Sequence, residues 1–403
     1  MLRTYIAVTP FFPSPESWRG AYCYDFIVAL KKVLLKNWRV EVFVPGKGSD
    51  YEIGGVVVRR FTTWQLPSNM LPFLFRKHNE RSFLRALERV GIKAGDVAVC
   101  HGHTANLAIY PLVIKRKNPA CLTLLHHHDL MSFGLNNGRL RHWGMYNRFI
   151  AKQLKRFHET IDCHVFISRL CEKSFRSFPD IDWLGDSDYS AQAKGVKGMT
   201  PVRVKRSVIL HNGVDVNLFR PRNTPNTRKD SAFVIGCVGN ISREKGQYDL
   251  LCAIPIVKEA LPDCQIKVKF IGSGDDLTRC RLYATQHGID AEFLPERRHE
   301  ELAEFYQGLD LFVLPTWLDG FGCVYTEAYA CGVPFIASTA AGVEELIRDD
   351  ERELWLVEPR NPKMLAGRIM SYIKNRPIQH LAKEIGIEEN LQLFVRTLEL
   401  LND

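Results

Sequence analysis

The sequence predicts an α/β protein with two Rossmann-like domains, each built on a doubly wound parallel sheet. Its 403 residues suffice for two domains of ordinary size, each with a buried core. Short apolar runs alternate with amphipathic stretches along the chain, the pattern that βαβ units produce. Residues 1–206 have a net charge of +16 (32 Lys and Arg against 16 Asp and Glu), and the remainder has −7 (22 against 29). A basic half joined to an acidic half indicates two domains with different partners.

In the basic half, residues 4–10 form the first expected strand, and a turn rich in proline and glycine follows it. Residues 21–36 form the first expected helix, because Phe26, Leu30 and Val33 fall on one side of it. Further strands are expected at 40–44, 56–60, 97–100, 121–125 and 163–167. Residues 179–206 have several aspartates followed by glycines and a proline, which predicts an exposed, partly disordered insertion.

A second βαβ series follows in the acidic half. Residues 207–210 form a strand, and the polar residues 213–231 are the expected linker. The expected strands are then 233–238, 266–271, 292–294, 311–314 and 334–337, and the expected helices are 247–261, 275–287, 300–307, 323–331 and 343–348. We therefore place one domain in residues 1–206, a second in 207–375, and a helical tail in 376–403.

Composition excludes several classes of protein. No apolar run reaches the roughly 18 residues of a membrane-spanning helix, and no signal-peptide cleavage pattern follows the N-terminus, so the expected compartment is the cytoplasm. The 11 cysteines are scattered without a C-x-x-C pair, which favours reduced, buried thiols over a disulfide framework or a zinc site. No metal ligand is therefore expected. The basic half has no nucleic-acid recognition motif.

Two segments of the basic half, 71–90 and 139–158, are amphipathic and basic. In the second, Trp143, Tyr146 and Ile150 recur at spacings of three and four, while basic residues fall on another face. Such segments can lie on an anionic membrane surface at the inner face of the cell membrane. They can equally pack an apolar stripe on the core and leave a basic face in water. The sequence leaves both interpretations open.

Three glycine turns follow predicted strands of the second domain, within residues 238–246, 271–276 and 319–327. Turns between a strand and a helix expose backbone N–H groups and a positive helix end, which suits a phosphate. Each turn taken singly is compatible with a purely structural role. Their common position at carboxyl ends of strands in one domain favours a phosphate site.

The third turn has further features of a ligand site. Gly320 and Gly322 have no Cβ to obstruct a ligand, and the helix begins near Cys323. The N–H groups of Gly322, Cys323 and Val324 lie at the helix start, where they suit a diphosphate. Glu327 lies one turn into the helix and can reach sugar or ribose hydroxyls.

This segment resembles the E-x₇-E motif of the family-four retaining glycosyltransferases, which have the GT-B fold of two Rossmann-like domains facing a central cleft. Residues 208–215 resemble that family's "vi-x-NGvD", and 239–246 its "G-R-x-x-x-x-K-G". Residues 293–306 resemble "F-L-G-x-v-x-x-E-E-L…Y", 315–338 resemble "PS…EGFG-x-x-x-lEAmAcG-x-PviaS", and 342–347 resemble "GG-x-x-E-iI". Weaker similarities in the first half are 18–21, His128-Asp129 and 163–170.

The resemblance implies that the second domain binds a nucleotide-diphosphate sugar and the first binds an acceptor. It implies that Lys245 neutralises the diphosphate, Glu327 binds ribose, Asp319 faces the transferred sugar, and His128 lies near the sugar. Catalysis is thereby assigned to Asp319, Glu327, His128 and Lys245. The donor-binding residues implied are Gly20, Ala21, Asn240, Arg243, Lys245, Gly272, Gly274, Glu296, Arg297, Phe321, Gly322, Cys323, Val324 and Glu327. His101 and His103 are further cleft candidates.

The family further implies transfer of a hexose-type sugar with retention, without metal or cofactor. The charge of the first half suggests an anionic acceptor such as a lipid-linked diphosphate glycan, in surface polysaccharide synthesis. Two residues depart from the family pattern. Asn240 occupies the place of an arginine, for which Arg243 is the nearest substitute, and Asp319 replaces the first glutamate of the motif.

Three other interpretations stay open. The two departures at Asn240 and Asp319 are compatible with a non-catalytic subunit that binds a sugar nucleotide or scaffolds other enzymes. Metal-dependent glycosyltransferases of another fold use a D-x-D triplet. This chain has two such triplets, at 180–182 and 186–188, but they lie in the expected insertion rather than at a strand end. A sugar-nucleotide epimerase of similar fold fits the 319–327 segment less well than a transferase does.

Overall fold

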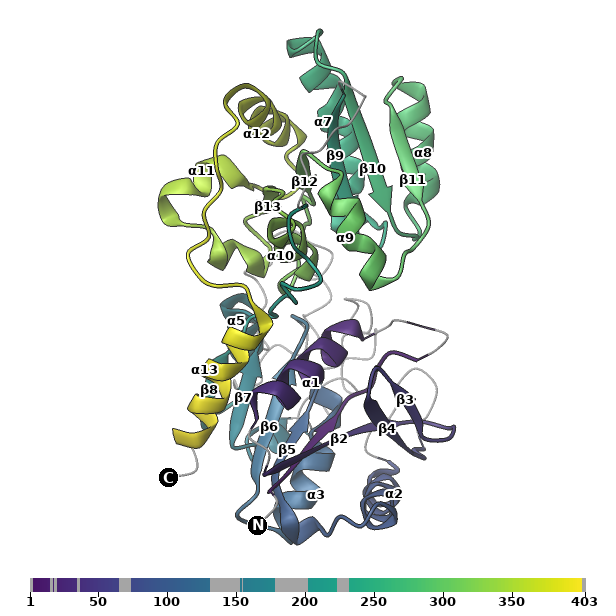
Figure 1. Cartoon of the computed structure of the whole chain (residues 1–403), viewed down its shortest axis with the longest axis vertical. Coiled ribbons are helices and arrows are strands. Elements are labelled where there is room, and N and C mark those ends of the chain that lie inside the picture. Colours follow the sequence, from purple (N-terminus) through teal and green to yellow (C-terminus); the bar gives the residue numbers. More distant parts are fainter. Residues whose placement is uncertain are drawn as a thin grey trace. The chain divides into compact units, whose positions relative to one another are not determined.

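The computed structural model describes residues 3–14, 17, 20–34, 37–64, 74–130, 153, 155–177, 202–222 and 232–400. The chain separates into two compact units. The first comprises Met1–His211 together with Leu391–Asp403, and the second comprises Asn212–Asn390. Each unit is a Rossmann-like parallel sheet with helices packed against it, which confirms the predicted fold class (Figure 1).

The first unit contains a sheet of strand order β3-β4-β2-β1-β5-β6-β7-β8. Its strands are β1 (Arg3–Val8), β2 (Trp38–Pro45), β3 (Tyr51–Ile53), β4 (Val56–Phe61), β5 (Val97–Gly102), β6 (Leu122–His127), β7 (Cys163–Phe166) and β8 (Ser207–Ile209). Only the edge pair β3–β4 is antiparallel among the described strands. The chain leaves β1 for β2 on one side and returns to β5 on the other, so the order reverses between β1 and β5.

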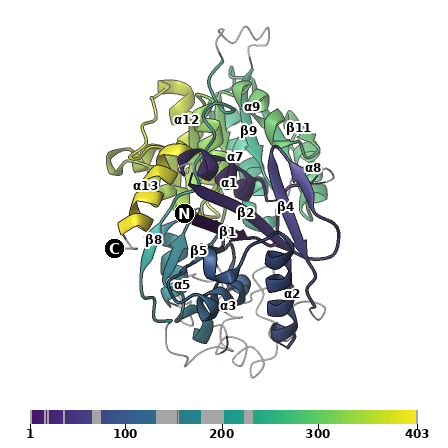
Figure 2. The ribbon, with the colours of Figure 1, turned by 60° about the horizontal axis from the view of Figure 1, so that its bottom comes forward.

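Helices cover both faces of this sheet. Its helices are α1 (Ala21–Val33), α2 (Arg76–Arg89), α3 (Ile109–Lys117), α5 (Arg169–Ser177) and the part of α13 (Ile387–Leu400) from Leu391 on, with short 3₁₀ turns at Ala94–Asp96 and Ala105–Leu107. Figure 2 shows α1 on one side of β1 and β2, and α2 and α3 on the other. Alternation along the strands divides the side chains between two cores. Ile6 and Val8 pack toward Phe83 of α2, whereas Tyr5 and His101 lie on the α1 face with Phe26.

The second unit contains a fully parallel sheet of order β11-β10-β9-β12-β13-β14. Its strands are β9 (Phe233–Val238), β10 (Ile266–Ile271), β11 (Ala291–Leu294), β12 (Leu311–Val313), β13 (Phe335–Ser338) and β14 (Leu356–Val357). Its helices are α7 (Gln247–Ala260), α8 (Leu277–Gln286), α9 (His299–Gln307), α10 (Cys323–Ala330), α11 (Arg352–Trp355) and α12 (Pro362–Asn375), with 3₁₀ turns at Arg243–Lys245, Gly342–Leu346 and Asp349–Glu351. Helix α7 packs with α8 and α12, and α9 packs with α10.

The predicted strands of the second unit agree with the observed ones to within one residue at each end. The structure differs from the prediction in several places, among them β14, α5 and α11, which were not predicted. Ser207–Ile209 pairs with β7 and completes the first sheet, so the compact second unit begins at Asn212 rather than at residue 207. The predicted helix at 343–348 is a 3₁₀ turn, and the antiparallel hairpin β3–β4 and helix α3 were not predicted.

None of the 11 cysteines, all of which lie in the described residues, forms a disulfide, and eight of them are buried, in agreement with the predicted buried thiols. No helix among the described residues is long and apolar enough to span a membrane. Several predictions lie outside the described residues. These are the basic segment 139–152, the insertion with its D-x-D triplets, the linker residues 223–231, and Trp18 and Arg19.

Candidate active site

The second unit brings its glycine turns together at one edge of the sheet. Strands β9 and β12 are neighbours, but the chain leaves β9 toward β10 and leaves β12 toward β13, on the opposite side. The loops after β9 and β12 therefore diverge and leave room for a ligand between them, as at the topological switch point of other open α/β sheets. The loop after β10 follows the same edge, because all three strands are parallel.

The loop after β9 is held against the loop after β12. The backbone N–H of Trp317 donates to the Glu244 carbonyl at 2.7 Å, and the Thr316 hydroxyl donates to the same carbonyl at 2.9 Å. Gly246 has a φ of 73°, and a Cβ there would lie 2.2 Å from the carbonyl oxygen of Pro315. Only glycine fits this position, and it lets the two loops approach closely.

The loop after β10 is held against the loop after β9 in the same way. The Ile241 N–H donates to the Ser273 carbonyl at 2.8 Å. Gly272 has a φ of 141° and Gly274 a φ of 152°, and a Cβ on either would lie within 2.3 Å of a backbone carbonyl oxygen of the first loop. The predicted phosphate turns thus form one hydrogen-bonded surface.

Lys245 and Asp319 form an ion pair across this surface. The Lys245 Nζ lies 2.5 Å from the Asp319 Oδ2, and the two side chains are 30% and 15% exposed. Burial disfavours the ammonium, but the adjacent Asp319 carboxylate outweighs burial and raises the pKa of Lys245. Lys245 therefore presents a positive charge at neutral pH that its carboxylate partner already neutralises.

The turn before α10 lies directly beside this pair. The Phe321 N–H approaches the Asp319 Oδ1 at 3.4 Å, and Gly322, with a φ of 83°, is the N-cap of α10. The first turn of a helix has N–H groups without intrahelical acceptors and a positive partial charge, both of which favour an anion. The predicted Cys323 and Val324 lie in this turn, and Asn212 Nδ2 donates to the Cys323 Sγ at 3.4 Å.

Glu327 is 6% exposed and points into a polar cluster rather than into water. The Tyr306 hydroxyl donates to its Oε2 at 2.8 Å, and His299 Nε2 lies 3.2 Å from its Oε1. Burial, followed by the Glu327 charge, raises the pKa of Tyr306 far above its ordinary value, so the phenol stays protonated as a donor. A carboxylate has about four acceptor positions, which leaves Glu327 capacity for a ligand hydroxyl.

The remaining donor-site predictions lie around these residues. Asn240 accepts a hydrogen bond from Gln247 through its backbone carbonyl at 3.0 Å, while Ser273 donates to the Glu296 carboxylate. Arg243 has its guanidinium 5.4 Å from the centroid of the Trp317 ring. Arg297 is exposed in the loop before α9. Of the predicted cations, Lys245 pairs with Asp319 itself, whereas Arg243 lies over Trp317 of the same loop.

Sequence reasoning missed some residues that contact this site. His299 was not assigned a role, although it contacts Glu327 from the first turn of α9. Trp317 donates through Nε1 to Asp249 Oδ2 at 2.6 Å, and the guanidinium of Arg360 lies 4.2 Å from its ring centroid. Arg360 also has a positive φ of 59°, which non-glycine residues rarely adopt and which often marks a functional position. No sequence spacing links these residues.

The remaining predicted residues belong to the first unit. Gly20 is the N-cap of α1 with a φ of 91°, and Ala21 begins the helix. A Cβ on Gly20 would lie 2.6 Å from the Phe11 carbonyl oxygen, so the close turn requires glycine. His128 is partly exposed, and its Nε2 lies 3.1 Å from His103 Nδ1. Burial, followed by the neighbouring His103 imidazole, lowers the pKa of His128, so the ring is neutral at pH 7.

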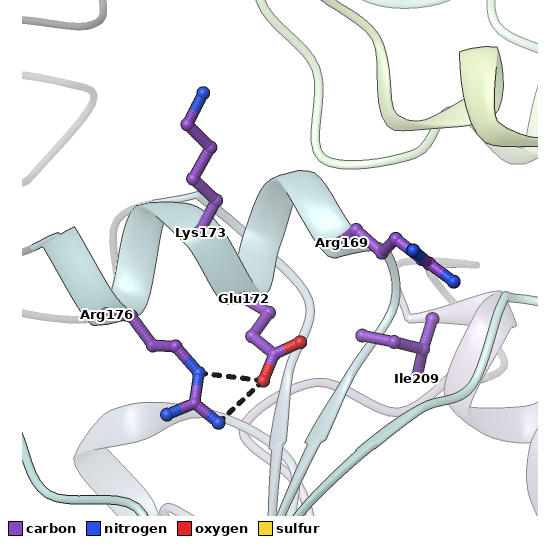
Figure 3. A pocket seen from close by; sticks show the side chains of 5 residues that line it. All are labelled: Arg169, Glu172, Lys173, Arg176 and Ile209. Carbon is purple, nitrogen blue, oxygen red and sulfur yellow. Dashed lines mark hydrogen bonds and ion pairs between the residues drawn. The ribbon is translucent and has the colours of Figure 1, made fainter.

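The first unit also has a basic pocket of about 710 Å³ against α5. The residues that line it are Arg169, Glu172, Lys173, Arg176 and Ile209. Figure 3 shows the Arg176 guanidinium turned to Glu172, with which it pairs at 2.8 Å, while the Lys173 amine points away from that pair. The net positive lining suits an anionic group.

Comparisons with known proteins give sequence matches to glycosyltransferases. Residues 220–389 match the family model of glycosyl transferases group 1. The chain is 34% identical over 184 residues to a D-inositol 3-phosphate glycosyltransferase of Corynebacterium urealyticum, a match that covers 41% of this chain and 43% of the relative. It is also 34% identical over 153 residues to a GDP-mannose-dependent monoacylated alpha-(1-6)-phosphatidylinositol monomannoside mannosyltransferase of Corynebacterium glutamicum, covering 34% and 40% of the two chains.

The fold as a whole also has close counterparts among solved structures. The structure of Anabaena HepE in complex with UDP superposes with a TM-score of 0.67 and 17% identity over 99% of this chain and 100% of that one. At this identity the match shows the shared two-domain fold alone. The chain spans less than half the length of the curated relatives it matches.

Proposed function

We propose that this chain, whose residues 220–389 match the family model of glycosyl transferases group 1, transfers a sugar from a nucleotide-diphosphate sugar. The observation that supports this most is the Lys245 ammonium beside the Gly322 turn, at the switch point of the second sheet. A cation and a helix start at one place form a site for a pyrophosphate. The relatives support the same donor class, since one is named as GDP-mannose-dependent and one fold neighbour holds UDP.

In the proposed reaction an acceptor hydroxyl attacks the anomeric carbon of the donor sugar. The bond from that carbon to the diphosphate oxygen breaks, and the nucleoside diphosphate leaves with the electron pair. The acceptor proton passes to the leaving diphosphate. Negative charge develops on the diphosphate, where Lys245 and the first turn of α10 stabilise it. In this scheme Glu327 binds the ribose, Asp319 faces the sugar, and the anomeric configuration is retained.

The proposed donor site needs no metal or cofactor if the protein itself supplies this positive charge. The acceptor in our proposal is a glycan or lipid-linked glycan of surface polysaccharide synthesis, reached in the cytoplasm at the inner face of the membrane. The exposed Arg81, Arg85 and Arg89 of α2 support an anionic acceptor or surface. The apolar face of α2 is used by the core through Phe83 and Leu87, so contact with a membrane there would be electrostatic.

Ligand-dependent thermal stability tests the proposal. UDP-, GDP- and ADP-sugars are added in turn, and a ligand at about 100 times its dissociation constant adds about 2.7 kcal/mol of stability. Lys245→Met should abolish the shift and lower transfer about 10²–10³-fold, as loss of a transition-state donor does elsewhere. The control is Lys267→Met, a solvent-accessible lysine on β10. Absence of a shift with every donor, or an unaltered shift in Lys245→Met, would contradict the proposal.

The second candidate is a non-catalytic subunit that binds a sugar nucleotide or scaffolds other enzymes. The observation that favours it is the ion pair itself, because Asp319 already neutralises the cation that the diphosphate requires. Release of nucleoside diphosphate from the donor, with and without EDTA, separates the candidates. Binding without any release would support the second, whereas release that persists in EDTA would support a metal-independent transferase.

A further inference from the structure

Three histidines of the first unit meet on one face of its sheet. His101 lies on β5 and His103 follows that strand, while His126 lies on the neighbouring β6. Residues two apart share a face, and His101 pairs with Leu124, so the register continued by two residues sets His103 beside His126. The ring centroid of His101 lies 4.2 Å from that of His103 and 5.3 Å from that of His126.

These rings are buried, yet most of their nitrogens have no hydrogen-bond partner. His101, His103 and His126 are at most 1% exposed. Nε2 of His101, Nε2 of His103 and both nitrogens of His126 lack a partner. A buried polar atom without a partner is costly, and such atoms are uncommon in folded proteins unless a water or an ion satisfies them.

The opposite face of the same sheet shows how this protein otherwise accommodates buried imidazoles. There His127 Nε2 lies 2.9 Å from His164 Nδ1, and His164 Nε2 lies 3.0 Å from the backbone carbonyl of His158. Hydrogen bonds thus connect these rings to one another and to the backbone. The unpartnered nitrogens of His101, His103 and His126 therefore contrast with the hydrogen-bonded rings of His127 and His164.

One ring of the set is already held in the orientation of a ligand. The Tyr5 hydroxyl lies 2.5 Å from Nδ1 of His101. When Nδ1 carries the proton and donates to Tyr5, the Nε2 lone pair is available, and a second group that orients the ring in this way is common for metal-binding histidines.

We propose that His101, His103 and His126 bind one divalent transition-metal ion of the Zn²⁺ class. One nitrogen of each residue lies within 4.8 Å of those of the other two. Tetrahedral zinc with Zn–N bonds of about 2.0 Å separates its ligand nitrogens by about 3.3 Å. Binding therefore requires the rings to turn toward a common centre, since those of His101 and His126 stack at an interplanar angle of 6°. The set contains no carboxylate, which disfavours Ca²⁺ and Mg²⁺, whereas imidazole suits Zn²⁺, Ni²⁺ and Cu²⁺.

The neighbouring residues extend this donor set. Cys23 Sγ lies 3.8 Å and His128 Nε2 lies 3.1 Å from Nδ1 of His103, on the other side of that ring from its unpartnered Nε2. His103 therefore lies between two groups of donors, and His128 at the partly exposed end marks the direction of solvent. A three-histidine site with a fourth position for water or another ligand is a known zinc arrangement.

Metal content and cobalt binding test this inference independently of sugar transfer. The full-length protein, purified without a histidine tag, is analysed by elemental mass spectrometry and then stripped with chelator and titrated with Co²⁺, whose visible absorption reports nitrogen ligation. We expect one ion per chain and a rise in Tm with Zn²⁺. Loss of an outer-shell contact typically weakens metal binding about 10–100-fold. His103→Ala and His126→Ala each remove a ligand, so each should weaken metal binding by at least this factor.

The matched control is His287→Ala, a histidine of the second unit outside the cluster, which should bind metal like the wild type. If the alanine variants do not fold, His126→Asn replaces them, because it keeps a polar side chain. The cobalt titration of the wild type tests the inference without any variant. No retained metal together with no cobalt spectrum in the wild type would overturn the inference, and buried water would then satisfy the rings. Equal binding by wild type and the cluster variants would also overturn it.

Discussion

Removal of a binding-site residue usually weakens ligand binding, but the ion pair between Lys245 and Asp319 predicts the opposite. We expect Asp319→Asn to strengthen the binding of a nucleoside diphosphate such as UDP or GDP. In the wild type the diphosphate must compete with the Asp319 carboxylate for the Lys245 ammonium, 2.5 Å away. The substitution removes the competitor and keeps a side chain of the same shape.

The exposure of the two side chains sets the size of the expected gain in affinity. Fully exposed pairs couple by about 0.2–1 kcal/mol, and breaking a buried pair costs about 3–5 kcal/mol. At 30% and 15% exposure this pair lies between those limits, and we take about 1.4 kcal/mol, which corresponds to about tenfold in affinity. The intact nucleotide sugar should gain less, because Asp319 is also proposed to contact the sugar, and transfer should slow.

The variant should also respond differently to pH. Burial lowers and Asp319 raises the pKa of Lys245, with a net rise above the ordinary 10.5. A group with a raised pKa contributes its stabilisation below the ordinary pKa and loses it as the pH rises through the folded value. Lys245 should therefore stay protonated between neutral pH and about pH 9, and its titration should not alter the affinity of the wild type for the nucleotide in that range. In Asp319→Asn burial still lowers the pKa of Lys245 while the largest opposing cause is removed, so binding should begin to weaken at a lower pH.

Isothermal titration calorimetry with UDP and GDP, repeated across this pH range, measures both effects. The control is Asp263→Asn, which makes the same charge change at an exposed position after α7. Weaker nucleotide binding in Asp319→Asn than in the control, or an identical affinity, would show that Asp319 does not compete for Lys245. If binding weakens, Asp319 would instead be part of the nucleotide-binding site.

Two further predictions concern the stability of the second unit. Tyr306→Phe should lower the free energy of unfolding by about 1.5–3 kcal/mol in denaturant titrations, because the hydroxyl donates to the buried Glu327 carboxylate. Tyr329→Phe, which loses a bond to a neutral carbonyl, should cost only about 0.5–1.5 kcal/mol, and equal costs would count against a charged acceptor. Gly272→Ala should destabilise by at least about 1–3 kcal/mol, because its φ is 141° and a Cβ would lie 2.1 Å from a backbone oxygen. Gly288→Ala, also at positive φ but with open space around it, should cost less, and the reverse order would refute the steric argument.

Strands β9 to β13 of the second domain could be predicted closely because each is a short apolar run between turn residues, whereas the two-residue β14 was not predicted. Burial on both faces of a parallel sheet requires such runs, and the requirement acts on consecutive residues. The third glycine turn was predictable for the same reason: Asp319, Gly322 and Glu327 lie within nine residues, so the strand–turn–helix junction is local. The domain boundary was harder to predict, since Ser207–Ile209 could extend either sheet. Only its pairing with β7 shows that it belongs to the first sheet.

The sequence alone determined the fold class, the family resemblance and the residues of the glycine turns, because these depend on spacing along the chain. Tertiary structure decided which of those residues meet. Lys245 and Asp319 are 74 positions apart, and His101 and His126 come from different strands. Such contacts depend on strand order and register, which the periodicity of one segment does not specify. The buried histidine cluster therefore appears only in the folded chain, where a sheet face and a covering helix remove its nitrogens from water.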